Sequence, residues 1–176
     1  MRVNGLANRT SIILDGVDRR RISVDRELSP ATRSKLGQFM TPAPIAQLMT
    51  SLFASMSGEV VLLDPGAGIG SLSSAFVERA VTERRATVIN VHAYELDLVM
   101  RRYLNATMSE CGEVCRHADI RFHWQTYCED FINAGVELLR DEHTLFASTP
   151  QRFTHCIMNP PYRKINSTSS TRTQLQ

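Results

Sequence analysis

The four consecutive residues Asn159, Pro160, Pro161 and Tyr162 carry groups that can hold a planar amine. An Asn amide oxygen and the carbonyl oxygen of the next residue can each accept a hydrogen bond from an NH2 group. Pro161 stiffens the turn, and Tyr162 offers a ring for stacking. The alternative is a strand that ends in a solvated proline-rich turn. Other parts of a binding site lie upstream and favour the first interpretation, in which residues 159–162 form a binding site for the amine, the amine seat.

A glycine-rich run follows the apolar residues 60–63. It consists of Asp64, Pro65, Gly66, Ala67, Gly68, Ile69 and Gly70. Glycines here allow a tight turn and a close approach of backbone to ligand, and a helix beginning after them would present free N–H groups to an anion. Ser71 stands where a dinucleotide-binding pattern needs its last glycine. The run predicts a nucleoside-binding turn, and the alternative is a glycine-rich turn without a ligand.

Alternating helix and strand patterns must position these segments. Apolar runs predict strands near residues 60–63, 86–94, 121–127 and 155–158. Helical spacing predicts a helix that Thr41 caps and Gly58 closes, and further helices near residues 71–84, 98–110 and 131–139. This order predicts a Rossmann-like, doubly wound α/β sheet of about four parallel strands, whose ligands bind at the carboxyl ends of the strands.

Two of these strand ends carry carboxylates. Glu95, after the second predicted strand, can accept hydrogen bonds from both hydroxyls of a ribose. After the third, Asp130 can bond an adenine amine while Phe131 packs on the purine ring; the alternative is a carboxylate at a helix N-terminus above a core phenylalanine. Asp97 is better explained as a helix cap. Together the strand ends predict a pocket for an adenosine that carries something other than two phosphates.

With these motifs, the segment Gln38-Phe39-Met40-Thr41-Pro42 resembles the gamma group of amino-methylating DNA methyltransferases of restriction-modification systems, which modify N6 of adenine. The resemblance covers about residues 35–162. It implies the methyltransferase fold, with S-adenosylmethionine as cofactor and double-stranded DNA as partner. The residues implied to bind the cofactor are Gln38, Phe39, Thr41, Pro42, Asp64, Pro65, Gly66, Ala67, Gly68, Gly70, Glu95, Asp130 and Phe131.

The resemblance also implies a mechanism for the amine seat. Adenine N6 is a poor nucleophile because its lone pair is conjugated into the ring, and acceptors at Asn159 and Pro160 would favour a more pyramidal, more reactive nitrogen. That nitrogen would attack the sulfonium methyl directly, without a catalytic cysteine. The adenine would be flipped out of the duplex and stacked on Tyr162.

Composition sets the remaining expectations. A net charge of +2 is compatible with nucleic acid without arguing for it, and the four cysteines show no CxxC pairing, so reduced thiols and no metal site are expected. No stretch has the length and apolarity of a membrane span or signal peptide, which favours a cytoplasmic protein. Residues 1–34 form an amino-terminal extension in which residues 12–16 suggest a hairpin, residues 35–162 form a partial catalytic domain, and residues 163–176 form a disordered polar tail.

Family members continue with three more strands and a target-recognition domain, which this sequence lacks. We therefore expect an amino-terminal fragment that is inactive alone, with the strand before Asn159 at an open sheet edge that a second chain could complete. Two other functions stay open. One is a methyltransferase acting on a protein glutamine amide, which also holds a planar NH2 group. The other is a truncated, non-enzymatic subunit or interaction module.

Overall fold

The computed structural model describes residues 12–27, 40–141 and 152–160. The helices are α1 (Ile12–Glu27), α3 (Ala43–Ser51), α4 (Ser71–Glu83), α5 (Leu98–His117) and α6 (Phe131–Asp141). The strands are β1 (Gly58–Pro65), β2 (Ala86–Tyr94), β3 (Arg121–Tyr127) and β4 (His155–Cys156). Four predicted site residues, Gln38, Phe39, Pro161 and Tyr162, lie outside the described residues, as does the predicted tail.

The strands form one parallel sheet in the order β3-β2-β1-β4. The chain moves outward from β1 through β2 to β3 and then returns past β1 to place β4 on its other side. The strand order therefore reverses between β1 and β4, and in open α/β sheets ligands bind in the crevice at such a reversal. This confirms the predicted Rossmann-like α/β class and the position of β4 at an edge of the described sheet.

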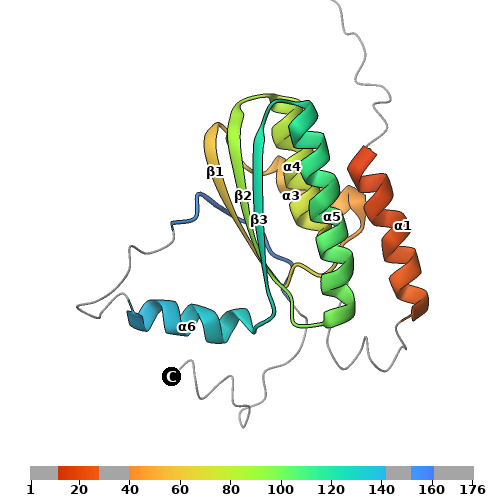
Figure 1. Ribbon diagram of the computed structural model, residues 1–176, viewed down its shortest axis with the longest axis vertical. Helices are drawn as coiled ribbons and strands as arrows, with labels where there is room; N and C mark the ends of the chain where they lie inside the picture. Colours follow the sequence, from red (N-terminus) through yellow and green to blue (C-terminus); the bar gives the residue numbers. More distant parts are fainter. Residues whose placement is uncertain (1–11, 28–39, 142–151, 161–176) are drawn as a thin grey trace, which may run out of the picture.

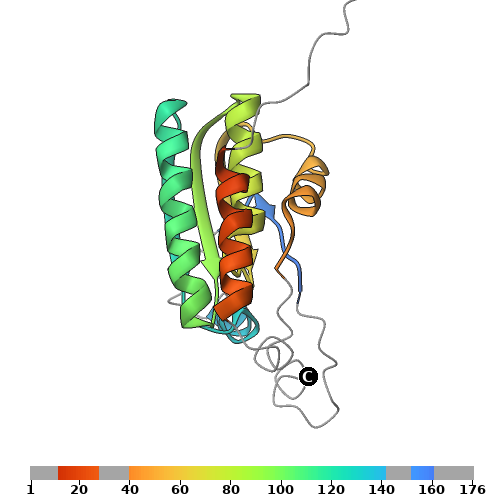
Figure 2. The same cartoon turned by 90° about the vertical axis from the view of Figure 1, so that its right-hand side faces the viewer.

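One face of the sheet carries a layer of helices (Figure 1). Helices α4 and α5 lie against the strands, α1 packs across both of them, and α3 packs on α4. Figure 2 shows that α3 lies beside residues 152–160, although 100 residues of sequence separate these segments. Among the described elements, only α6 lies near the opposite face, at the carboxyl end of β3. The segment that leads into α3 and the segment that follows β4 therefore lie on the same side of the fold.

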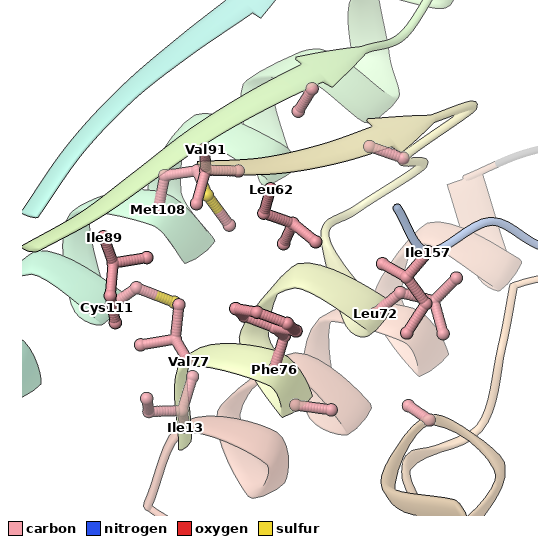
Figure 3. Close-up of a cluster of buried hydrophobic side chains, with 14 of the residues drawn as sticks. Ile13, Leu62, Leu72, Phe76, Val77, Ile89, Val91, Met108, Cys111 and Ile157 are labelled. Carbon is pink, nitrogen blue, oxygen red and sulfur yellow. The ribbon is translucent and has the colours of Figure 1, made fainter. Parts of the chain in front are cut away.

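The core lies between the sheet and its helical layer (Figure 3). Phe76 of α4 is fully buried at its centre, between Leu62 of β1 and Ile13 of α1. Ile157, just after β4, joins the same cluster. Each such side chain contributes about 1.5–3 kcal/mol on full burial. The core therefore extends as far as the segment that carries Asn159, so packing helps to hold that segment against β1.

The predicted hairpin at residues 12–16 is wrong, because these residues begin helix α1. Ile13, Leu14, Val17 and Val24 lie on one side of that helix and are 0–2% exposed against α4 and α5. Burial of this apolar side outweighs the turn tendency of the Asp-Gly pair, since a two-residue hairpin here would leave much of that surface in water.

Three other predictions need correction. Helix α5 runs through Gly112 instead of ending before it, because the buried residues Met108, Cys111 and Cys115 continue one side of the helix past this glycine. Thr41 does not cap α3, whose N-cap is Pro42 without a side-chain hydrogen bond. The helix expected to be closed by Gly58 ends at Ser51, and Gly58 instead begins strand β1.

Candidate functional site

The glycine-rich run and Asn159 follow neighbouring strands and lie at the same edge of the sheet. Asp64 is near the carboxyl end of β1, and Asn159 comes three residues after β4. The Ile157 N–H donates to the Leu63 carbonyl at 3.0 Å, which continues the pairing of the two strands toward the site. The Ala67 N–H donates to the Tyr94 carbonyl at 2.9 Å and ties the run to the end of β2. Three strand ends are thus joined across the reversal in strand order.

The glycines of the run adopt the left-handed backbone conformation that other residues resist. Their φ angles are 69° at Gly66, 58° at Gly68 and 87° at Gly70. A Cβ added at Gly66 or Gly68 would meet no atom within 4 Å, whereas one at Gly70 would lie 3.0 Å from a methyl group of Leu104. The first two glycines therefore leave open space beside the backbone, where a ligand can approach. Gly70 instead lets α4 pack closely on α5.

The N–H groups of this turn are mostly used inside the protein. Gly68 donates to Glu95 Oε2 at 2.8 Å, Gly70 donates to the Ala67 carbonyl at 2.9 Å, and the Ala67 N–H is bonded to Tyr94. A phosphate cradle needs several such groups free and pointing at the ligand. The N–H groups of Ala67, Gly68 and Gly70 are therefore not available to a phosphate. The arrangement suits a nucleoside without phosphates at this turn.

Glu95 joins the ends of β1 and β2. Its two oxygens accept hydrogen bonds from the N–H groups of Gly68 and Asp97, each at 2.8 Å. The side chain is 6% exposed, and burial raises its pKa, although the bonds to Asp97 and Gly68 oppose that shift. Carboxylate oxygens can accept more than one hydrogen bond each, so this residue can still accept from a hydroxyl group. Its predicted contact with a ribose stays a prediction.

Asp64 is the most unusual group in the site. It is completely buried, and its Oδ2 accepts a hydrogen bond of 2.5 Å from the Ser73 hydroxyl. Its Oδ1 is buried and has no hydrogen-bond partner among the residues that the structure describes. Burial raises its pKa from 3.8 to about 7, and the Ser73 bonds only partly oppose this shift. An unpaired buried acceptor is costly, and such groups collect at functional sites.

Sequence reasoning missed the role of Ser73. This serine lies in the first turn of α4 and is 0% exposed. Its hydroxyl fixes the Asp64 carboxylate and so couples the end of β1 to the start of the helix. The burial of the serines at positions 71, 73 and 74 is visible only in the structure, so the sequence held no signal for this contact.

Asn159 contacts the upstream segment directly. Its Nδ2 donates a hydrogen bond of 3.1 Å to the hydroxyl oxygen of Thr41, a residue 118 positions earlier. Thr41 is buried and Asn159 is half-buried. Two motifs that the sequence placed at opposite ends of the resemblance are therefore in contact. Pro160 follows as an exposed residue.

Asp130 and Phe131 take the structural roles that were their alternative explanation. Asp130 Oδ1 accepts a 2.8 Å hydrogen bond from the Ile132 N–H, at the start of α6. Phe131 packs edge-on against Tyr94, with ring centroids 5.2 Å apart, in a small cluster at the end of the sheet. Both follow β3, which is separated from β1 by β2. Their predicted contact with an adenine stays a prediction.

No group of three or more metal-binding side chains occurs in the part of the chain that the structure describes. The cysteines within it, residues 111, 115, 128 and 156, are free thiols. Within the same described ranges, every helix is too short or too polar to cross a bilayer.

The sheet order and the motif geometry define an α/β protein with a candidate ligand site at the carboxyl ends of its strands, and sequence comparison gives its family. The chain matches the N-6 DNA Methylase family over residues 26–174. Because this match covers most of the chain, the protein belongs to that family. The resemblance inferred from the motifs is confirmed.

Two curated relatives are restriction-modification methylases by name. The chain is 39% identical over 165 residues to the Type II methyltransferase M.BsuBI of Bacillus subtilis, an alignment that covers 93% of this chain and 31% of the relative. It is 36% identical over 160 residues to the Type II methyltransferase M.PstI of Providencia stuartii, with 91% and 30% covered. The chain thus spans about a third of the length of the relatives it matches.

Proposed function

We propose that this chain supplies the cofactor-binding strand ends and the amine seat of an S-adenosylmethionine-dependent methyltransferase that acts on N6 of adenine in DNA. The observation that carries this proposal is the placement of the glycine-rich turn and Asn159 at adjacent strand ends, across the reversal between β1 and β4. Family membership and the names of both relatives support the same reaction. No observation favours the glutamine alternative over DNA.

The residues present fit the cofactor. S-adenosylmethionine, when bound, supplies a methyl group on a positively charged sulfur. Asp64 contributes a buried carboxylate with an unpaired oxygen, and it is suited to a site that receives positive charge. Gly66 and Gly68 leave room for close approach of the ligand, and Glu95 stands at the next strand end, where a ribose would bind. These residues would hold the cofactor without any metal.

Asn159 and Pro160 would hold the reacting amine. The Asn159 Oδ1 and the Pro160 carbonyl are acceptors, so each can take one of the two N6 hydrogens. Bonds to both hydrogens draw the nitrogen out of conjugation and aim its lone pair, which is orientation and electrostatic stabilisation rather than proton transfer by a tuned base. An adenine in a duplex must be flipped out to reach this seat, and Tyr162 would then stack on its ring.

Double-stranded DNA as substrate and a cytoplasmic location belong to this proposal. The inactivity of the isolated 176-residue chain stays a prediction. It is checked by measuring methyl transfer to duplex DNA with the purified chain, and substantial transfer would contradict it.

Calorimetric titration with S-adenosylmethionine tests the cofactor site. The parent chain should bind, and Asp64→Ala should lose most of the affinity. Glu113→Gln is the matched control, because this exposed acid pairs with Arg116 near the far end of α5. It should bind like the parent. Absence of binding by the parent, or equal binding by Asp64→Ala and the parent when both are folded, would refute the proposal.

A second candidate, an interaction module completed by another chain, has one supporting observation. Strand β4 has two ladder residues and lies at an edge of the described sheet, where its outer side can pair with a further strand. Size-exclusion chromatography with light scattering tests it directly. A monomeric mass at all concentrations, together with cofactor binding, would favour the methyltransferase reading alone.

A further inference from the structure

The contact between Thr41 and Asn159 has a direction. The Asn159 amide is the donor, through Nδ2, and the Thr41 hydroxyl oxygen is the acceptor, at 3.1 Å. An Asn side chain has one acceptor oxygen and one donor NH2 group, at opposite sides of the amide plane. Committing Nδ2 to Thr41 therefore leaves Oδ1 for another partner. An incoming amine needs this oxygen, because an amine hydrogen cannot bond to Nδ2.

Thr41 is well placed to enforce this orientation. It is 6% exposed, so water competes little for its hydroxyl. It is also released from helix capping, because Pro42 is the N-cap of α3 and the carbonyl of Pro42 accepts the first hydrogen bonds of that helix. The ring of Pro42 fixes the local backbone at φ −64°. The hydroxyl is thus held by a rigid segment and directed at Asn159 rather than at its own helix.

The surrounding contacts hold Asn159 within reach of this hydroxyl. Ile157, two residues earlier, is 4% exposed in the core and hydrogen-bonded to β1. His155 packs edge-on against Phe53, which follows α3, with ring centroids 5.1 Å apart, and its Nε2 lies 2.8 Å from the Ser55 carbonyl. The segment with Asn159 and the segment after α3 are therefore packed together independently of the Thr41 bond.

We propose that Thr41 is a positioning residue for the target amine: its hydroxyl holds the Asn159 amide so that Oδ1 faces the substrate. The role rests on the proposed function, but the bond itself does not. Without the hydroxyl the amide can rotate and present Nδ2 to the amine. The amide then spends about half of its time in the orientation that can accept the amine, which corresponds to about a twofold loss of preference for an amine-bearing ligand.

The bond is tested first without any ligand. In the 15N-labelled chain, the Asn159 side-chain NH2 signals are identified by their loss in Asn159→Asp. Thr41→Val replaces the hydroxyl by a methyl group of similar shape and should move these signals toward those of a free amide, whereas Thr41→Ser should keep them. Thr50→Val is the matched control, because Thr50 is also buried and its hydroxyl donates to the Gln47 carbonyl on the same helix. Unchanged Asn159 signals in folded Thr41→Val would overturn the proposal.

The role is tested with two small probes, 9-methyladenine and 9-methylpurine, which differ in the amine. Shifts of the Asn159 signals during titration report binding to each. The parent, Thr41→Ser and Thr50→Val should prefer the adenine, and in Thr41→Val this preference should fall about twofold. Equal preference in Thr41→Val and the parent, or no preference in any variant, would overturn the role. Failure of the proposed cofactor site would appear separately, as absent S-adenosylmethionine binding with the Thr41-dependent signals intact.

Discussion

Replacing Asp64 by Asn should remove a large part of the pH dependence of folding stability. The amide keeps the size of the side chain and can still accept the Ser73 hydrogen bond, but it does not titrate. In the parent, burial raises the pKa of Asp64 from 3.8 to about 7. Because the folded pKa lies above the unfolded one, the folded protein keeps this proton at pH values where the unfolded chain has released it. Stability therefore falls as the pH rises from about 4 to about 7 and is constant with respect to this group above that window.

The size of the effect follows from the same two values. A rise from 3.8 to about 7 is about three units, which corresponds to about 4 kcal/mol between fully protonated and fully ionised Asp64. Part of this cost is already present at pH 5, so about 2 to 3 kcal/mol remains between pH 5 and pH 8. This is a large fraction of the stability of a typical domain.

Urea unfolding of the parent and Asp64→Asn at both pH values measures this difference. Titrating groups other than Glu95 and Cys156, which interact electrostatically with Asp64, contribute equally to both proteins, so the change in the parent minus the change in the variant gives mainly the effect of Asp64. The parent should lose about 2 to 3 kcal/mol more than the variant on going from pH 5 to pH 8. Equal losses would refute the reasoning, because they would mean that Asp64 is not buried as an uncompensated carboxylate.

Three further predictions concern the same edge of the sheet. Gly70→Ala should cost about 2–4 kcal/mol of unfolding free energy, from its left-handed backbone and its contact with Leu104, whereas Gly68→Ala should cost about 1 kcal/mol and mainly weaken cofactor binding. Urea unfolding and calorimetry separate the two, and equal destabilisation would contradict the packing argument. Ser73→Ala should cost about 1–3 kcal/mol by thermal denaturation, while Ser23→Ala, at an exposed helix position, should cost far less. The affinity for S-adenosylmethionine should rise with pH up to about 7 in the parent and rise much less in Asp64→Asn, because the cationic ligand favours ionised Asp64; parallel pH profiles in calorimetry would contradict this.

The sequence was sufficient to predict the sheet, because its strands carry apolar runs. Val60 and Leu62 are fully buried on one face of β1, whereas Val61 on the other face is half-buried. The failures lie where tertiary packing overrides a local signal. Gly112 ends no helix because Cys111 and Cys115 keep one side of α5 buried past it, and the turn signal at Asp15 and Gly16 yields to burial of one side of α1.

The candidate site was predictable in its parts but less so in its connections. Strand ends and glycine spacing locate Asp64, Glu95 and Asn159 because parallel strands bring their carboxyl ends to one edge. Nothing in the spacing reveals that Ser73 fixes Asp64, or that Thr41 bonds to Asn159 instead of capping its helix. Both contacts join residues through side-chain direction in three dimensions, which periodicity alone does not encode.

These two unforeseen contacts give the site a common design. In each contact, the hydroxyl group of a buried serine or threonine is hydrogen-bonded to one polar atom of an Asp or Asn side chain. The second polar atom of that side chain makes no bond to this hydroxyl. Ser73 holds Oδ2 of Asp64 and leaves Oδ1 unpaired, and Thr41 holds Nδ2 of Asn159 and leaves Oδ1 for another partner. An acceptor kept in place before the ligand arrives loses little orientational freedom on binding, so more of the binding energy is available for alignment of the amine and the methyl group. Substitutions of Ser73 and Thr41 should therefore change the ligand preference and the pH dependence of ligand binding more than they change the structure of the sheet.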